Sequence, residues 1–99
     1  MNREDESYKM KNTRPIKPIE PATTITNEEK FLHIVIELPG VAEEKIRIDL
    51  ENSSTMITIV ANDDEKQYKK IIPIPCEVRF SKKRFSKGVL ELILEKKQT

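Results

Sequence analysis

Few side chains in this chain of 99 residues could perform chemistry. His33 is the only histidine and Cys76 the only cysteine, and they lie far apart in the sequence. A Cys–His nucleophilic pair would need both to meet in space, with a third group to orient the imidazole. A zinc site needs more ligands than these two residues supply. The sequence therefore predicts neither a catalytic residue nor a metal site.

The carboxylates and glycines also lack the patterns of a catalytic or cofactor site. Gly40 and Gly88 are the only glycines, so a Gly-rich phosphate loop cannot form. The Asp and Glu residues fall in expected turns or on strand faces, and no pair is placed for general acid–base work. We expect a protein that is not an enzyme and that binds no cofactor.

A basic cluster raises the possibility of nucleic-acid binding, because a positive strip can follow a phosphate backbone. Its members are Lys82, Lys83, Arg84 and Lys87. The aromatic residues among them, Phe80 and Phe85, are expected in the core rather than as stacking platforms for bases. A net charge of +1 adds no general attraction for polyanions. Solvated loop charge is the simpler interpretation, and no nucleic-acid partner is expected.

The stretch over residues 31–50 has the pattern of two strands joined by a short turn. Leucine and isoleucine alternate with other residues over 31–38, and isoleucine and leucine alternate with charged residues over 46–50. Successive side chains of a strand point to opposite faces, so each segment has one apolar face. Pro39 and Gly40 end the first strand, and residues 41–44 leave room for one helical turn.

Strand-like alternation continues along the rest of the chain. It covers residues 55–61, 67–74 and 89–95, with a short edge strand expected at 22–26 and another around Val78 and Phe80. Pro73 restricts its strand to a sheet edge or a strand end, because proline has no amide hydrogen to donate. Polar turns separate the strands, and no segment has a helical period. The sequence predicts an all-β, antiparallel β-sandwich.

Both ends of the chain differ from this pattern. Residues 1–21 carry many charges and three regularly spaced prolines, which predicts a flexible polar arm, although Ile16 and Ile19 could instead dock in an apolar groove. We expect the sandwich over 22–95 and a frayed tail over 96–99. No apolar run approaches the roughly 18 residues of a membrane span, and the N-terminus lacks a signal-peptide core. We expect a cytoplasmic protein with no membrane association.

Three short motifs occur in the order typical of one family. They are Leu38-Pro39-Gly40, then Tyr68-Lys69-Lys70 ending in Ile74-Pro75, then Gly88-Val89-Leu90. Over residues 23–95 the chain resembles the alpha-crystallin domain of small heat-shock proteins. The resemblance implies an immunoglobulin-like sandwich and a stress-response chaperone that binds unfolding proteins without ATP. It also implies structural roles for Leu38, Pro39, Gly40, Gly88, Val89 and Leu90.

The chain departs from this family at several places. Lys83 stands where the family usually has alanine, and Glu95 stands where a proline often follows. The arm is short and polar, the tail lacks an Ile-x-Ile motif, and residues 62–67 form a hairpin turn where many members have a long exchanged loop. These departures favour a monomer or a homodimer through edge pairing over a large oligomer.

Apolar residues on outer strand faces indicate that the protein binds other polypeptides. They are Phe31, Val35, Val89 and Ile93. The expected contact surface is the sheet edge and groove around Ile46, Ile48 and Leu50. The leading hypothesis is an ATP-independent holdase that binds apolar segments of unfolding client proteins. The alternative is a co-chaperone or adaptor of the CS type, which shares the sandwich but recognises one specific folded partner.

Overall fold

Seven strands and one short helical turn account for most of the described chain. The computed structural model describes residues 17–51 and 55–97. The strands are β1 (Thr23–Asn27), β2 (Phe31–Glu37), β3 (Ile46–Glu51), β4 (Met56–Asn62), β5 (Gln67–Pro73), β6 (Val78–Ser86) and β7 (Val89–Lys96), and the 3-10 helix η2 spans Glu43–Lys45. The helical turn follows Gly40 where the sequence predicts it. No helix in the described part of the chain is long and apolar enough to cross a membrane.

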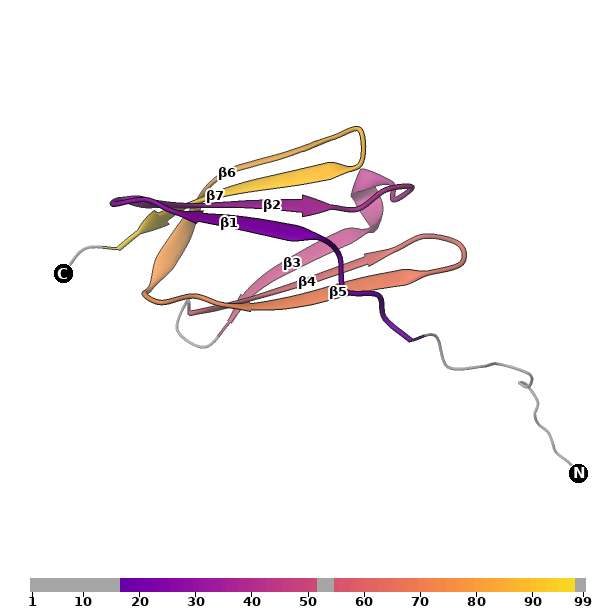
Figure 1. Ribbon diagram of the computed structural model, residues 1–99, viewed down its shortest axis with the longest axis horizontal. Coiled ribbons are helices and arrows are strands. Elements are labelled where there is room, and N and C mark those ends of the chain that lie inside the picture. Colours follow the sequence, from indigo (N-terminus) through magenta and orange to yellow (C-terminus); the bar gives the residue numbers. More distant parts are fainter. Residues whose placement is uncertain (1–16, 52–54, 98–99) are drawn as a thin grey trace, which may run out of the picture.

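The strands form two antiparallel sheets that stack as a sandwich (Figure 1). One sheet has the order β1-β2-β7-β6 and the other has the order β3-β4-β5. The chain crosses between them from β2 to β3 and from β5 to β6, so the strands on either side of Pro39-Gly40 lie in different sheets. The predicted all-β sandwich is confirmed, as are the edge positions of β1 and of the strand that ends at Pro73.

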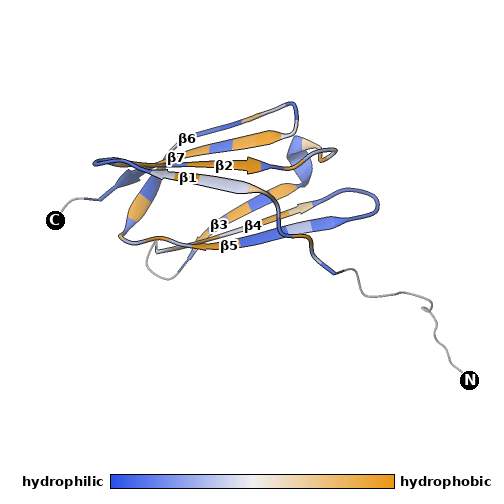
Figure 2. Ribbon diagram, in the orientation of Figure 1, coloured by the Kyte–Doolittle hydropathy of each residue, from blue (hydrophilic) through white to orange (hydrophobic). Residues whose placement is uncertain are grey.

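The core follows from the alternation of apolar residues, visible as orange and blue segments along β7 in Figure 2. Every second residue of β2, β4 and β7 is buried, and these residues point into the space between the two sheets. Full burial of one such aliphatic side chain stabilises the fold by roughly 1.5–3 kcal/mol. The most deeply buried residues of the whole core are Ile34, Ile36, Leu38, Ile57, Ile59, Ala61, Val78, Leu92 and Leu94.

Two of the motifs behind the family resemblance meet in one contact. The backbone N–H of Leu38 donates to the carbonyl oxygen of Gly88 at 2.7 Å. Gly40 and Gly88 have φ angles of +81° and +78°, in the left-handed region that glycine tolerates best. Leu38 and Leu90 are buried, whereas Pro39 and Val89 are exposed. The turn before β3 and the turn between β6 and β7 therefore support each other.

β6 is the strand that the sequence predicted least well. Residues after Phe80 were expected in a loop, but all nine residues from Val78 to Ser86 form one strand that pairs with β7. The register shifts between Phe80 and Lys82, because Ser81 is an extra residue at a bulge. β6 lies at a sheet edge, where charged side chains reach water, and its lysines and arginines fit there.

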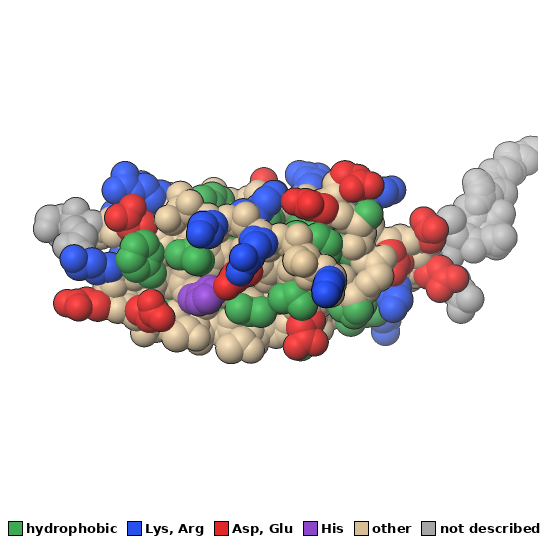
Figure 3. Space-filling view, turned by 90° about the horizontal axis from the view of Figure 1, so that it is seen from above, with side chains coloured by type: hydrophobic (Ala, Val, Ile, Leu, Met, Phe, Trp, Pro, Cys, Tyr) green, Lys and Arg blue, Asp and Glu red, His purple; other side chains and the backbone are tan. Residues whose placement is uncertain are grey.

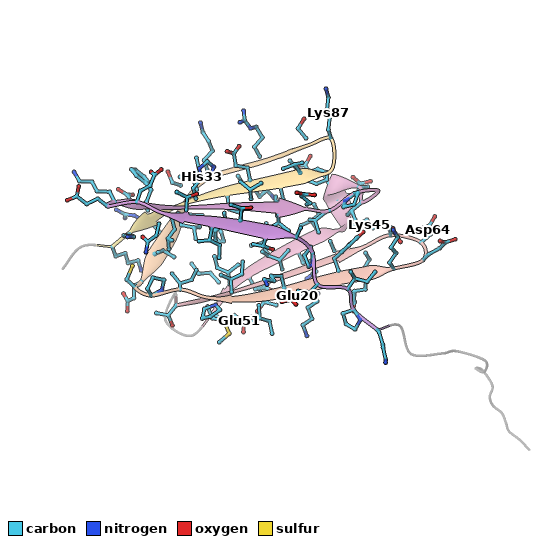
Figure 4. All side chains as sticks on the ribbon, viewed as in Figure 1. Glu20, His33, Lys45, Glu51, Asp64 and Lys87 are labelled. Carbon is cyan, nitrogen blue, oxygen red and sulfur yellow. The ribbon has the colours of Figure 1, made fainter. Side chains whose placement is uncertain are left out.

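Ile19 forms an isolated β-bridge with the outer edge of β5. The backbone N–H of Ile19 donates to the carbonyl of Gln67 at 2.7 Å, and its carbonyl accepts from the N–H of Lys69 at 3.0 Å. Glu20 lies beside β5, with its carboxylate 2.7 Å from Nζ of Lys70 (Figure 4). The sequence pattern places these residues in the arm, and the structure shows them in contact with the sandwich. Ile16, the other isoleucine of the arm, lies outside the described residues.

Asp63 closes the turn between β4 and β5. Its Oδ1 accepts the backbone N–H groups of Glu65 at 2.7 Å and Lys66 at 2.6 Å. These two hydrogen bonds, first that from Glu65, hold the pKa of the Asp63 carboxyl below its ordinary value of 3.8. The ionised form of Asp63 is therefore favoured in the folded state relative to the unfolded state.

Asp63→Asn is expected to remove a pH-dependent part of the stability while leaving an oxygen that can accept the same hydrogen bonds. A lowered folded-state pKa adds stability that is complete above the unfolded pKa and is lost as pH falls through the folded pKa. The difference in unfolding free energy between wild type and variant should therefore shrink below about pH 4. Urea titrations at several pH values measure it. Asp64→Asn is the control, and an equal shrinkage in that variant would contradict the assignment.

Candidate functional site

A groove opens between the edges of the two sheets at β3 and β6. Its lining residues are Ile46, Arg47, Ile48, Asp49, Phe80 and Lys83, and it encloses about 500 Å³. This volume lies within the range of about 300–1,000 Å³ that is usual for ligand sites. On β5, by contrast, Ile19 already occupies part of the edge before the chain continues into β1. No described segment pairs with the outer edge of β3 or of β6.

Two of the three residues predicted for the groove line it. Ile46 and Ile48 pair with Ala61 and Ile59 of β4, both fully buried, so they project toward the inside of the sandwich. Because β3 is an edge strand, they remain half-buried. Leu50 projects to the same side and packs against the core, but it is not among the residues that line the groove.

Phe80 forms the apolar part of the opposite wall. It was expected in the core, but its side chain is 44% exposed. That expectation is wrong because β6 is an edge strand, which leaves the ring at the mouth of the groove. Phe85, by contrast, is half-buried and packs against the core as expected. No local sequence signal separates the two phenylalanines, since both occur among basic residues.

The outer face of the four-stranded sheet carries a second apolar surface. Phe31, Val35, Val89 and Ile93 lie on it, as the alternation predicts, and they line two shallow depressions of about 340 and 370 Å³. Figure 3, which looks onto this face, shows hydrophobic side chains interrupted by charged side chains and histidine. Both depressions are smaller than the groove between β3 and β6.

A polar cluster occupies the middle of that outer face. Nε2 of His33 lies 2.5 Å from Oε2 of Glu91, and Nη2 of Arg84 lies 2.9 Å from Oε1 of the same carboxylate. The contact with His33 and then that with Arg84 hold the pKa of Glu91 below its usual range. Cys76 lies in the connection between β5 and β6 and packs against the core. In residues 17–51 and 55–97, no three metal-binding side chains gather at one place.

The side chains of the basic cluster point in different directions. Lys82 and Arg84 pair with Ile93 and Glu91 and project to the outer face, whereas Lys83 lines the groove. Lys87 lies in the turn between β6 and β7 (Figure 4). The residues therefore belong to a strand and its turn rather than to a loop, and they do not form one continuous positive strip.

This protein is similar to known proteins in its structure rather than in its sequence. No protein-family model matches the sequence. No curated protein sequence is significantly similar to it. Solved structures do match in fold, at sequence identities of 14% to 19% for three of them.

Three solved structures illustrate the likeness. Heat shock protein 16.0 from Schizosaccharomyces pombe has a TM-score of 0.71 at 19% identity, over 89% of this chain and 74% of that one. HSP18.5 from E. histolytica has a TM-score of 0.68 at 16% identity, over 79% and 88%. A small heat shock protein from Synechococcus phage S-ShM2 has a TM-score of 0.64 at 14% identity, over 81% and 89%. The protein therefore has the β-sandwich fold of small heat-shock proteins, the alpha-crystallin domain.

Proposed function

We propose that this protein is an ATP-independent holdase chaperone. It binds extended apolar segments of unfolding client proteins in the groove between β3 and β6 and keeps them from aggregating. The observation that carries this proposal is the open groove itself, with Ile46 and Ile48 on one wall and the exposed ring of Phe80 on the other. The likeness in fold to heat shock proteins supports the same role.

The edges of the groove suit an extended peptide. Within residues 17–51 and 55–97, β3 pairs with β4 on one side only and β6 pairs with β7 on one side only, so their outer edges offer backbone groups that no described strand pairs with. A client segment can add to such an edge through main-chain hydrogen bonds while its alternate side chains enter the groove. Main-chain pairing is independent of sequence, which fits a protein that holds many different clients.

Phe80→Glu is expected to weaken binding of apolar segments by at least about tenfold, since an occupant would lose its contact with the apolar ring and would remove water from the new carboxylate. The ring is exposed, so the substitution should change the stability of the sandwich little. The measurement is light scattering of a heated client with increasing amounts of wild type or variant. The wild type should suppress aggregation at about stoichiometric amounts, and Phe80→Glu should fail to do so.

Ile71→Glu provides a matched control. Ile71 is 50% exposed on β5, outside the groove, so the same loss of an apolar side chain occurs elsewhere. This variant should protect the client as well as wild type does. An equal loss of protection against aggregation in both variants would show that general surface hydrophobicity, not the groove, holds the client. A wild type that protects none of several unrelated clients would refute the holdase proposal.

A second candidate function, an adaptor for one folded protein, is favoured by the outer face of the four-stranded sheet. Val35 and Val89 lie there beside the paired charges of Arg84 and Glu91, and such a mixed apolar and charged surface suits a folded partner. Under this alternative, Val35→Glu should abolish partner binding while Phe80→Glu should leave it intact. Pull-down of a native protein with the two variants distinguishes them.

The proposal also includes a homodimer as the state of assembly and the cytoplasm as the location. The outer edge of β1 has no strand partner within the described chain, so a homodimer could form there through antiparallel pairing. Cys76 is a free thiol, which is common for proteins of a reducing compartment such as the cytoplasm. Sedimentation of the purified chain measures its state of assembly.

A further inference from the structure

Among the described residues, Lys83 is the one lysine that lines the groove, and the direction of its side chain follows from strand pairing. It lies opposite Leu92 of β7, whose side chain is fully buried. Side chains directly across an antiparallel pair project to the same side of the sheet, so Lys83 projects toward the space between the sheets. Its neighbours Lys82 and Arg84 lie opposite Ile93 and Glu91 and project to the outer face. At the edge of the sandwich, Lys83 therefore lines the groove.

The positive charge of Lys83 has no partner in the groove. Arg47, the other cation there, lies 3.8 Å from the carboxylate of Asp49. On the same strand as Lys83, Arg79 is paired with Glu95 and Arg84 with Glu91. No ion pair or hydrogen bond joins the Lys83 side chain to another described residue. The groove thus combines apolar walls with one uncompensated cation.

We infer that the groove selects apolar segments that carry a carboxylate, and that Lys83 is the residue that recognises it. This inference rests on the proposed function and names the chemical class of its preferred client. A segment that covers Ile46, Ile48 and Phe80 also removes water from the neighbouring ammonium group. Desolvation of an unpaired charge costs free energy, and a carboxylate on the segment offsets that cost through a charge-assisted hydrogen bond.

A purely structural role for Lys83 predicts a different result. An inward-pointing charge on an edge strand can prevent unwanted pairing between copies of a protein. In that case neutralising Lys83 would increase self-association, and the affinity for acidic and neutral peptides would change to the same extent. Recognition of a carboxylate by Lys83 requires instead that the affinities for the acidic and the neutral peptide change by different factors.

The test uses two short fluorescent peptides that share a Val-Thr-Val centre and differ in having Glu or Gln at both flanks. Fluorescence anisotropy with the full chain measures their dissociation constants. Wild type is expected to prefer the Glu peptide by about fivefold at low salt, the size typical of a partly exposed charge pair. The preference should disappear at about 1 M salt, where the Debye length is about 3 Å.

Three variants assign the preference to one side chain. Lys83→Gln should bind both peptides equally, and Lys83→Glu should prefer the Gln peptide. Lys82→Gln, which removes a neighbouring charge from the outer face, should keep the wild-type preference. If wild type binds both peptides equally at low salt, the inference is wrong while the holdase proposal stands. If neither peptide binds wild type, both fail.

Discussion

Replacing Leu92 by alanine is expected to lower the free energy of unfolding by about 2–5 kcal/mol, the usual cost of removing a buried leucine side chain. Leu92 is fully buried in β7, and it pairs with Ile34 of β2 on one side. The sheet cannot move inward to fill the space left by the leucine side chain. The variant therefore loses the free energy of burying that side chain and also carries the cost of a cavity. Urea unfolding followed by circular dichroism measures the change.

Exposed and conservative variants make this result interpretable. Ile71→Ala removes an aliphatic side chain that is half-exposed on β5 and should cost less than about 1 kcal/mol. Leu92→Met nearly conserves volume and should cost less than about 1.5 kcal/mol, so it remains measurable if the alanine variant does not fold. A loss at Leu92→Ala no greater than that at Ile71→Ala would contradict the position of Leu92 in the core.

Gly88→Ala is expected to destabilise the protein by about 1–3 kcal/mol through backbone strain and crowding. The residue has a φ of +78°, which alanine adopts only with strain. A Cβ at this position would lie 3.3 Å from Cα of Pro39 and 3.5 Å from the carbonyl oxygen of Leu38. Both are backbone atoms of a turn that is hydrogen-bonded to Gly88, so they cannot move aside independently. Thermal unfolding measures the loss.

Gly40→Ala separates strain from crowding. Gly40 has nearly the same φ, +81°, but a Cβ there would meet only the Asp63 side chain at an ordinary 3.8 Å. This variant should therefore show the cost of the backbone angle alone, about 1–2 kcal/mol. The amount by which Gly88→Ala lowers the free energy of unfolding more than Gly40→Ala does measures the contribution of the contact between the two turns. If Gly40→Ala is the more damaging substitution, the turn contact does not have the importance given to it here.

These stability variants complement the binding variants, because none of them lies in the groove. Gly88 belongs to the β6–β7 turn and Leu92 to the core, whereas Phe80 and Lys83 line the groove. A protein weakened at Gly88 should still bind apolar peptides at temperatures where it is folded. Phe80→Glu should be folded and fail to bind. This separation of effects is what a binding site on a pre-formed sandwich predicts.

Much of the fold could be predicted from the sequence because strand alternation is a local property. The pattern of Leu32, Ile34 and Ile36, and that of Leu90, Leu92 and Leu94, identified two core strands before their partners were known. Pro39-Gly40 and Gly88 marked turns because of their own backbone preferences. The same alternation predicted the solvent-facing sides of these strands, where His33 and Glu91 lie.

Other features depend on which strands become neighbours, and only the tertiary structure decides that. β6 has little alternation of its own, and a bulge at Ser81 reverses the direction of its later side chains, so its length and faces follow from pairing with β7. Ile19 is an arm residue by composition and becomes part of the sandwich because the edge of β5 offers it two hydrogen bonds.

The groove is the clearest case of such a non-local feature. The sequence identified Ile46 and Ile48 as members of an apolar strand face, and local physics determines no more than that. Whether that face is covered depends on how two sheets stack, which brings Phe80 and Lys83 opposite β3 from more than 30 positions further along the chain. Sheet stacking is governed by the summed burial of the whole core and not by any one segment. The sequence alone therefore determined most of the strands, their turns and most of the core, and the tertiary structure determined the extent of β6 and the groove beside it.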